Sequence, residues 1–276
     1  MKIRRPLVVL SELAIVPGGL KLSWELIAGQ KVAIMGASGS GKSLLLDVIL
    51  GQEQPASGQV TLSGKAAAAG MGGFGRRDTP LGVAKAISPD LNNVVETLSA
   101  LGLWESRESR ILDLPPGLAS ACDLIEPLLC SEEIVAFDGN LDLLDPWTLR
   151  SVLDFMDSQA RLGKAFLVAT NNPSAAERLG GVIVLREGSA RFAGSAQDLI
   201  RHTKPAELLI ETDDETLVSE IIKPFAISIR KARQGMLIKT EKGQEAAAIL
   251  LLKGYGRVRS VLMKEPTFEE ALLEFY

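Results

Sequence analysis

Two patterns of apolar positions divide the chain near residue 204. Before this point, short apolar runs alternate with longer segments that are amphipathic or strongly apolar. The runs suit buried parallel strands and the longer segments suit helices. Predicted strands lie at residues 32–35, 134–138, 165–170 and 182–185, and predicted helices at 44–50, 92–103, 118–129 and 146–160. This alternation predicts an α/β domain with a mostly parallel sheet that helices cover on both faces.

Strand-like alternation of period two appears at the beginning of the chain. Residues 7–10 and 20–26 predict an antiparallel pair around a turn at Pro17, and residues 60–62 predict a further strand. Residues 64–82 are small and rich in glycine, so we expect an irregular surface connection there with Arg76, Arg77 and Asp78 exposed.

After residue 204 the pattern changes to strand, helix, two strands, helix and strand. The strands are expected at residues 207–212, 225–230, 236–240 and 257–263, the helices at 215–222 and 244–252, and a terminal helix at 268–275. This order predicts a small ferredoxin-like α+β domain. The sequence therefore predicts two domains, at residues 1–204 and 205–276.

The most specific motif lies between the first predicted parallel strand and its helix. It fits G-x-x-x-x-G-K-[ST], the phosphate-binding P-loop, and consists of Gly36, Ala37, Ser38, Gly39, Ser40, Gly41, Lys42 and Ser43. Glycines let the backbone turn its N–H groups inward, and the helix N-terminus adds partial positive charge. A glycine-rich turn without a ligand is the alternative, but the flanking strand and helix favour phosphate binding.

Two residues are candidates for a metal site. The hydroxyl of Ser43 would bind Mg²⁺, while Lys42 would reach the β- and γ-phosphates. Asp138 ends the apolar run 134–138, and a carboxylate at that place orients the Mg²⁺ shell in P-loop proteins. The predicted cofactors are therefore ATP and Mg²⁺.

Composition narrows the functional classes further. The 276 residues carry a net charge of −4 with a pI near 5.3, so no broad basic face argues for nucleic acid. No apolar run reaches the roughly 18 to 20 residues needed to cross a bilayer. Cys122 and Cys130 are too few for a disulfide framework or a zinc site and are interpreted as small core residues.

These motifs together resemble the nucleotide-binding subunit of ABC transporters. The P-loop is joined by Pro-Ala-Ser-Gly-Gln-Val at residues 55–60 and by Val-Leu-Arg-Glu-Gly at 184–188. The tail at residues 258–270 is similar to the end of ATPases that serve ABC-2-type exporters. The resemblance implies a membrane permease subunit as partner and a cytoplasmic location at the inner face of the cell membrane.

The chain departs from this family where the family performs catalysis. The interval of 138 − 114 = 24 steps places Leu-Pro-Pro-Gly-Leu, residues 114–118, at the LSGGQ signature and Gly139 at the catalytic Glu. Asn171 stands near the position of the switch His, and no glutamine lies between Gln59 and Gln159 for the Q-loop. No aromatic residue precedes Trp24 to stack on adenine.

The joint loss of these groups predicts a degenerate ATPase that binds nucleotide but hydrolyses it weakly or not at all, with no catalytic residue of its own. Because ABC ATPases sandwich nucleotides between two subunits, we expect this chain to be the regulatory or structural half of a heterodimer with a partner ATPase. Asp145 could contact that partner or cap the helix that opens at Pro146. Asn171 could weakly replace the switch His.

Two other functions remain open. A soluble regulatory or scaffold protein with the same fold is favoured by the missing Q-loop glutamine and by the short region between Val60 and Asn92, where the family docks its membrane partner. A P-loop kinase would need an activating carboxylate and an arginine lid, which the sequence does not place.

Overall fold

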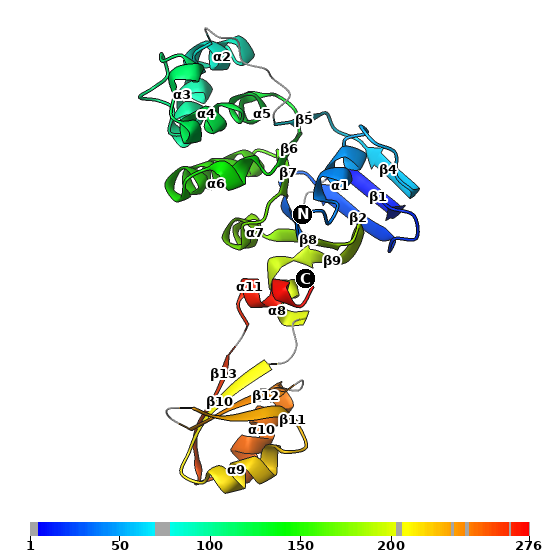
Figure 1. Cartoon of the computed structure of the whole chain (residues 1–276), viewed down its shortest axis with the longest axis vertical. Helices are drawn as coiled ribbons and strands as arrows, with labels where there is room; N and C mark the ends of the chain where they lie inside the picture. The colour runs from blue at the N-terminus through cyan, green and yellow to red at the C-terminus, as the bar shows by residue number, and fades with distance from the viewer. Residues whose placement is uncertain are drawn as a thin grey trace. The chain divides into compact units, whose positions relative to one another are not determined.

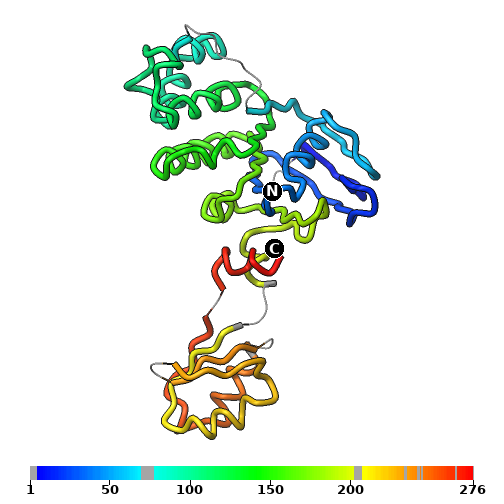
Figure 2. Tube along the Cα trace, viewed as in Figure 1, coloured from blue at the N-terminus to red at the C-terminus, as the bar shows by residue number. Residues whose placement is uncertain are grey.

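The computed structural model describes residues 5–69, 78–202, 206–232, 235–240, 243–264 and 266–275 (Figures 1 and 2). The chain divides into two compact units, Met1–Ala196 with Phe275–Tyr276 and Gln197–Glu274, and each is described by itself. The first unit ends 204 − 196 = 8 residues before the boundary expected from the sequence. The domain limits 1–204 and 205–276 stay a prediction.

The centre of the first unit is a six-stranded sheet with the order β5-β6-β7-β3-β8-β9. Its strands are β3 (Lys31–Met35), β5 (Ala66–Ala68), β6 (Ile134–Asp138), β7 (Ala165–Ala169), β8 (Gly181–Arg186) and β9 (Ser189–Ser195). All neighbours pair in parallel except β8 and β9. The predicted mostly parallel sheet is confirmed. Its parallel order brings the carboxyl ends of β3, β6 and β7 to one edge.

A second, antiparallel sheet lies beside helix α1 (Figure 1). It has the order β2-β1-β4 and consists of β1 (Pro6–Ala14), β2 (Leu22–Ile27) and β4 (Ser57–Leu62). Leu10 pairs with Trp24 on one side of β1 and with Val60 on the other. The predicted antiparallel pair at the beginning of the chain is therefore confirmed.

Helices lie on both faces of the parallel sheet (Figure 1). Helix α1 contacts β6 and β7, whereas α6 contacts β7 and α7 contacts β3 and β8. The helices are α1 (Lys42–Ile49), α2 (Pro80–Ile87), α3 (Leu91–Ala100), α4 (Pro116–Cys122), α5 (Ile125–Leu129), α6 (Pro146–Arg161) and α7 (Pro173–Leu179), with short 3₁₀ turns η1 (Ile111–Asp113) and η2 (Asn140–Leu143). Helices α2, α3 and α5 contact one another and form a helical group after β5.

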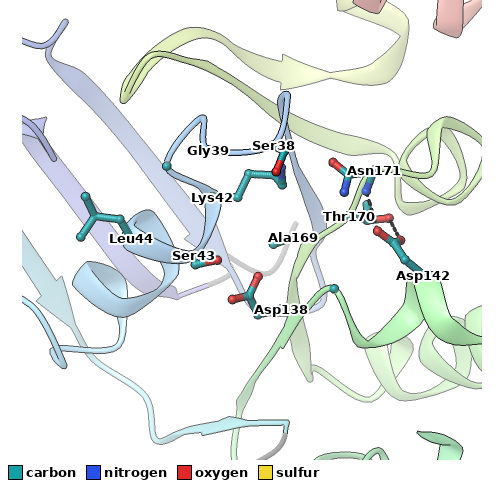
Figure 3. Close-up of a pocket in the computed structure, with 12 residues that line it drawn as sticks. Ser38, Gly39, Lys42, Ser43, Leu44, Asp138, Asp142, Ala169, Thr170 and Asn171 are labelled. Atoms are coloured by element: carbon teal, nitrogen blue, oxygen red, sulfur yellow. Dashed lines mark hydrogen bonds between the residues drawn. The ribbon is translucent and has the colours of Figure 1, made fainter.

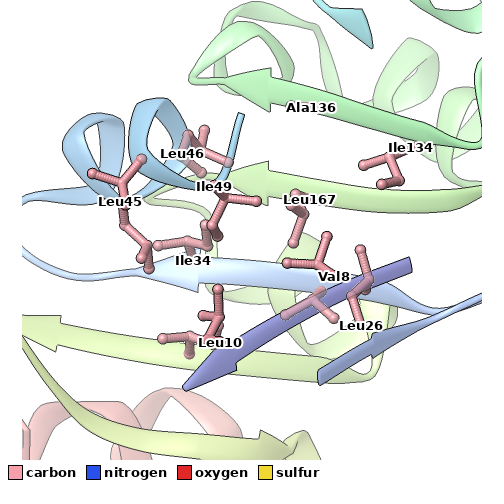
Figure 4. Close-up of a cluster of buried hydrophobic side chains, with 14 of the residues drawn as sticks. Val8, Leu10, Leu26, Ile34, Leu45, Leu46, Ile49, Ile134, Ala136 and Leu167 are labelled. Atoms are coloured by element: carbon pink, nitrogen blue, oxygen red, sulfur yellow. The ribbon is translucent and has the colours of Figure 1, made fainter. Parts of the chain in front are cut away.

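The main core fills the space between α1, the parallel sheet and the antiparallel sheet (Figure 4). Leu45 and Ile49 of α1 meet Ile34 of β3, while Val8 and Leu10 come from β1, and each is at most 1% exposed. Truncating a buried leucine of this kind to alanine costs about 2–5 kcal/mol. The core thus fixes the start of α1, and with it the P-loop, against the sheet.

Two expectations from the sequence were wrong. Residues 64–82 are not wholly irregular, because they contain β5 and the start of α2, whose first turn is capped by the Thr79 side chain. The rest of that stretch, residues 70–77 with Arg76 and Arg77, lies outside the described residues. Residues 118–129 form two helices rather than one. Pro127 has no N–H to donate to the carbonyl of residue 123, so a continuous helix would lose a hydrogen bond there.

The second unit contains a four-stranded antiparallel sheet with the order β11-β12-β10-β13. Its elements are α8 (Ala196–His202), β10 (Ala206–Thr212), α9 (Glu215–Ile222), β11 (Ala226–Ala232), β12 (Gly235–Thr240), α10 (Gly243–Lys253), β13 (Val258–Lys264) and α11 (Phe268–Leu273). Val218 of α9 and Leu250 of α10 share one core with Leu208 and Ile238 of the sheet, so both helices cover the same face. The strand order is that of the ferredoxin-like topology.

None of the helices in the described ranges is both long enough and apolar enough to cross a membrane.

Candidate functional site

The loop between β3 and α1 has a backbone that only glycine accommodates at its first position. Gly36 has φ +152°, and a Cβ there would lie 2.4 Å from both the Leu185 carbonyl oxygen and the Ser40 hydroxyl oxygen. At Gly41, φ is +98° and a Cβ would meet the Cδ1 atom of Ile15 at 3.1 Å. Close packing and positive φ angles therefore require glycine at these positions of the motif.

Lys42 folds back over this loop. Its ammonium donates hydrogen bonds to the carbonyl oxygens of Gly36, at 2.6 Å, and of Ala37, at 3.1 Å. Burial lowers the pKa of Lys42, while the negative charges of Asp138 and Asp142 oppose that shift. The cation therefore stands between the P-loop and two carboxylates.

A cavity of about 370 Å³ opens beside the loop (Figure 3). It is lined by Ser38, Gly39, Gly41, Lys42, Ser43, Leu44, Asp138, Gly139, Asp142, Ala169, Thr170 and Asn171. Of the residues predicted from the sequence, Gly36, Ala37 and Ser40 shape the loop without lining the cavity. The other P-loop residues and Asp138 line it, so the structure brings the predicted site together.

The oxygen atoms of side chains in the cavity fit a magnesium-bound nucleotide. Ser43 and Asp138 place a hydroxyl and a carboxylate on the same cavity, and oxygen ligands are those that Mg²⁺ prefers. No group of three or more His, Cys, Asp or Glu residues that could hold a metal occurs in the described part of the chain. Ser43 and Asp138 would thus hold Mg²⁺ together with phosphate oxygens and water, as is usual for this ion.

The residues of the P-loop differ in how closely they are packed. The hydroxyl oxygen of Ser40 is buried and has no hydrogen-bond partner among the described residues. Around a Cβ built on Gly39, at φ +78°, no heavy atom lies within 4 Å. The loop therefore combines a tightly packed base with an open rim.

On the far side of the cavity, sequence reasoning named Gly139 and Asn171 but missed Asp142. Asp142, in η2, accepts a short hydrogen bond from the Thr170 hydroxyl and a 2.8 Å bond from the N–H of Asn171. Thr170 and Asn171 directly follow β7, and Asp138 ends β6. Carboxylates and polar residues that follow neighbouring parallel strands meet at one sheet edge, and this rule could have drawn attention to Asp142.

Comparison with known proteins agrees with this geometry. The family model described as ABC transporter matches residues 20–111. A solved structure titled as the ATP-binding subunit of an ABC transporter aligns with a TM-score of 0.60 at 20% identity, covering 71% of this chain and 92% of that chain. The first unit has the fold of an ABC transporter ATP-binding domain. A bacterial Atm1-family ABC exporter solved with ATP bound aligns with a TM-score of 0.62 at 19% identity, over 74% of this chain and 41% of the exporter chain.

Curated relatives are ABC ATP-binding proteins. The chain is 23% identical to the glycine betaine/carnitine transport ATP-binding protein GbuA of Listeria monocytogenes, over 89% of this chain and 70% of that protein. It is 24% identical to the Nod factor export ATP-binding protein I of Rhizobium johnstonii, over 91% and 88%. It is 29% identical to the lipoprotein-releasing system ATP-binding protein LolD of Pseudomonas fluorescens, over 64% and 89%. The comparisons thus support an ATP-binding subunit of an ABC transporter.

Three positions that differ from the ABC pattern are well defined in the structure. Gly139 follows β6 with φ +74°, and a Cβ there would meet no heavy atom within 4 Å. Helix α4 begins at Pro116, with Pro115 at its N-cap and no side-chain cap hydrogen bond. Asn171 lines the cavity at the end of β7. At Gly139, the position that the resemblance assigns to the catalytic Glu, the space is therefore open and no side chain is present.

Asp145 caps helix α6, as one of its two interpretations from the sequence anticipated. Its carboxylate accepts hydrogen bonds from the N–H groups of Trp147, at 2.9 Å, and Thr148, at 3.1 Å, and from the Thr148 hydroxyl. These hydrogen bonds lower the pKa of Asp145, and the bond from the Thr148 hydroxyl contributes most to this shift. A contact of Asp145 with a partner subunit stays a prediction.

Among the described residues that line this cavity, none is aromatic. Trp24 lines a different cavity, with Gln30 and Lys31 at the opposite end of β3. The side chain that packs beside the P-loop at Gly41 is the aliphatic Ile15. The structure thus gives the adenine no aromatic platform within this cavity.

Proposed function

We propose that this chain is the nucleotide-binding subunit of an ABC-type transporter, that it holds Mg-ATP on residues 36–43, and that it hydrolyses ATP weakly or not at all. One observation carries the proposal. Five of the eight P-loop residues and Asp138 line one cavity with Gly139, which has no side chain to activate water.

Nucleotide binding follows from groups that the fold holds in place. The N-terminus of α1 lies at the cavity with Lys42 and Ser43, and backbone N–H groups of the P-loop would bind phosphate there. Lys42 would contact the terminal phosphates, and Ser43 with Asp138 would hold Mg²⁺. Bound Mg²⁺ would neutralise phosphate charge there.

Weak hydrolysis follows from the residues on the side of the cavity opposite the P-loop. Asp138 is assigned to the metal, and Asp142 is engaged by Thr170 and Asn171. General-base and electrostatic groups each typically contribute about 10² to 10⁴ in rate. With no free carboxylate at Gly139 and an amide at Asn171, the cavity lacks two groups of this kind.

The stretch at residues 114–118 supports a heterodimer. Pro115 and Pro116 have no N–H to donate to a phosphate held by a partner, and no serine is present. The family match ends at residue 111, three residues before this stretch (114 − 111 = 3). We infer that an ATPase partner with intact motifs completes the pair and that this chain is its regulatory or structural half. The pair would work on a membrane permease, as a peripheral subunit at the inner face of the membrane.

An exporter is the proposed transport class. The Nod factor export relative covers 91% of this chain, so the similarity extends into the second unit. The tail at residues 258–270 resembles ABC-2-type exporter ATPases, which also favours this class.

A soluble regulatory or scaffold protein is the second candidate. It is favoured by the absence of any glutamine after β5, since the residues that follow Ala68 up to Gln159 contain none. A permease gene beside the gene for this chain would favour the transporter subunit, whereas its absence would favour the scaffold.

Co-purification from the native source tests the proposed assembly. A tagged chain should bring down a second ABC ATPase and a membrane permease in equal amounts. The Lys42→Ala variant should retain the permease, because docking does not involve the P-loop. Recovery of the tagged chain only as a self-dimer would contradict the heterodimer.

A further inference from the structure

Asp142 is a cavity residue for which the proposed function above gives no role. Resting on that proposed nucleotide binding, we propose that Asp142 is a specificity-determining residue. Its fixed carboxylate faces the terminal phosphates and lowers the preference of the site for nucleoside triphosphate over diphosphate.

The position of the carboxylate is fixed by two hydrogen bonds. One oxygen accepts from the hydroxyl of Thr170, and the other accepts from the N–H of Asn171 at 2.8 Å (Figure 3). Thr170 is fully buried, and its N–H donates to the carbonyl oxygen of Ile34 in β3, at 3.2 Å. The carboxylate is thus tied to the end of the central sheet.

The segment that Asp142 holds is itself firmly anchored. Asn172 donates its N–H to the Thr170 hydroxyl at 3.0 Å, and its side chain accepts from the N–H of Ala175 in the first turn of α7. Both oxygens of Asp142 are used, and hydrogen bonds to a charged group are stronger than those between neutral groups. Movement of the segment 170–171 toward a phosphate would break these bonds.

The charge of Asp142 acts on the phosphate-binding side of the cavity. Asp142 lines the same cavity as Lys42, Ser43 and Asp138. Because Lys42 would contact the terminal phosphates, Asp142 would lie on the side of the cavity that faces them. Mg²⁺ would offset the charge of Asp138, whereas the two groups that hydrogen-bond to Asp142 are neutral.

The consequence is a penalty that grows with phosphate charge. A triphosphate brings about one more negative charge than a diphosphate, and that charge is the one placed farthest along the cavity. The cavity is open and Asp142 is exposed, so solvent and salt screen the repulsion to a moderate size. We therefore expect ADP to compete well with ATP at this site.

Titration calorimetry of the full chain with Mg-ADP and with Mg-ATP tests the proposal. Asp142→Asn keeps the shape of the side chain and removes its charge. It should raise the affinity for ATP relative to ADP by about fivefold at low salt and by less at high salt. Glu177→Gln, on the exposed surface of α7 outside the cavity, removes one charge elsewhere and should leave the ratio unchanged. An unchanged ratio in Asp142→Asn, with both nucleotides still bound, would overturn the role of Asp142.

Hydrogen exchange separates the hydrogen bonds from the charge. In Asp142→Ser, the amide of Asn171 should exchange at least about tenfold faster, because its acceptor is gone. An equal exchange rate in this variant would show that Asp142 does not hold the segment. If the unmodified chain bound neither nucleotide, the proposed function itself would fail, which is distinct from a failure of the Asp142 role alone.

Discussion

In the proposed function, the P-loop side of the cavity and the side that faces it match the ABC pattern to different extents. On the P-loop side, residues 36–43 match the phosphate-binding motif at every defined position, and the loop is packed tightly against β8. On the facing side lie Gly139, Asp142 and Asn171, and the resemblance assigns Gly139 and Asn171 to the positions of the catalytic Glu and the switch His. One side of a site can therefore keep the groups that bind phosphate while the other side loses the groups that activate water.

The difference has a structural cause. Phosphate binding rests on backbone N–H groups and glycine conformations that are built into the junction of β3 and α1, next to the main core. Catalysis rests on a few side chains in loops that follow strands, and these can change without disturbing packing. A Cβ at Gly139 would meet no heavy atom within 4 Å, so packing does not constrain that position, although its φ of +74° favours glycine.

Substitution of two P-loop glycines should give the largest effect, which is on the free energy of unfolding. Gly36→Ala would force a Cβ to within 2.4 Å of a backbone oxygen, whereas Gly39→Ala would add one in open space. We expect a loss in unfolding free energy of about 3 kcal/mol for the first, from steric overlap and strain, and of about 1 kcal/mol for the second. Urea denaturation measures both, and equal losses would show that the base of the loop is not tightly packed.

Removal of the P-loop cation comes next. Lys42→Ala should weaken Mg-ATP binding by about 100-fold, because a charge-assisted contact to phosphate is lost. Lys85→Ala, on the exposed face of α2, is the matched control and should leave the dissociation constant unchanged. Equal binding by both lysine variants in equilibrium dialysis would mean that the nucleotide does not use the P-loop.

Restoring the missing base should have a smaller effect. Gly139→Glu has room for its side chain, although its backbone at φ +74° costs about 1 kcal/mol. We expect ATP turnover to rise by at most about tenfold, because the switch and signature groups remain absent and such groups act together. Recovery to a rate typical of enzymes would show that Gly139 alone disabled the site.

The preference of the site for one nucleotide base over another should be the smallest effect. Aromatic contacts of a nucleotide base are worth about 1–3 kcal/mol, and none of the described residues that line the cavity is aromatic. ATP and GTP should therefore bind with dissociation constants within about threefold of each other in competition titrations. A preference above about tenfold for ATP would reveal a base-recognising group outside the described cavity.

The sequence was sufficient for the parallel sheet, the P-loop and the role of Asp138 as a strand-end carboxylate, because periodicity and motif spacing are local signals. It missed helix α2, because the glycine-rich residues before this helix predicted an irregular segment that extended past the helix start at Thr79 and Pro80. It also missed the contact of Asp142 with Thr170, which lie 28 residues apart. Such a contact depends on which strands become neighbours, and local patterns do not determine this.

The most direct test of the central claim is ATP binding and turnover measured on the same purified chain. We predict saturable binding of Mg-ATP that Lys42→Ala weakens by about 100-fold, with turnover far below the rate of about 1 per second at the low end of typical enzymes. Turnover at or above that rate by the chain alone, lost in Lys42→Ala, would contradict a site that binds nucleotide without consuming it.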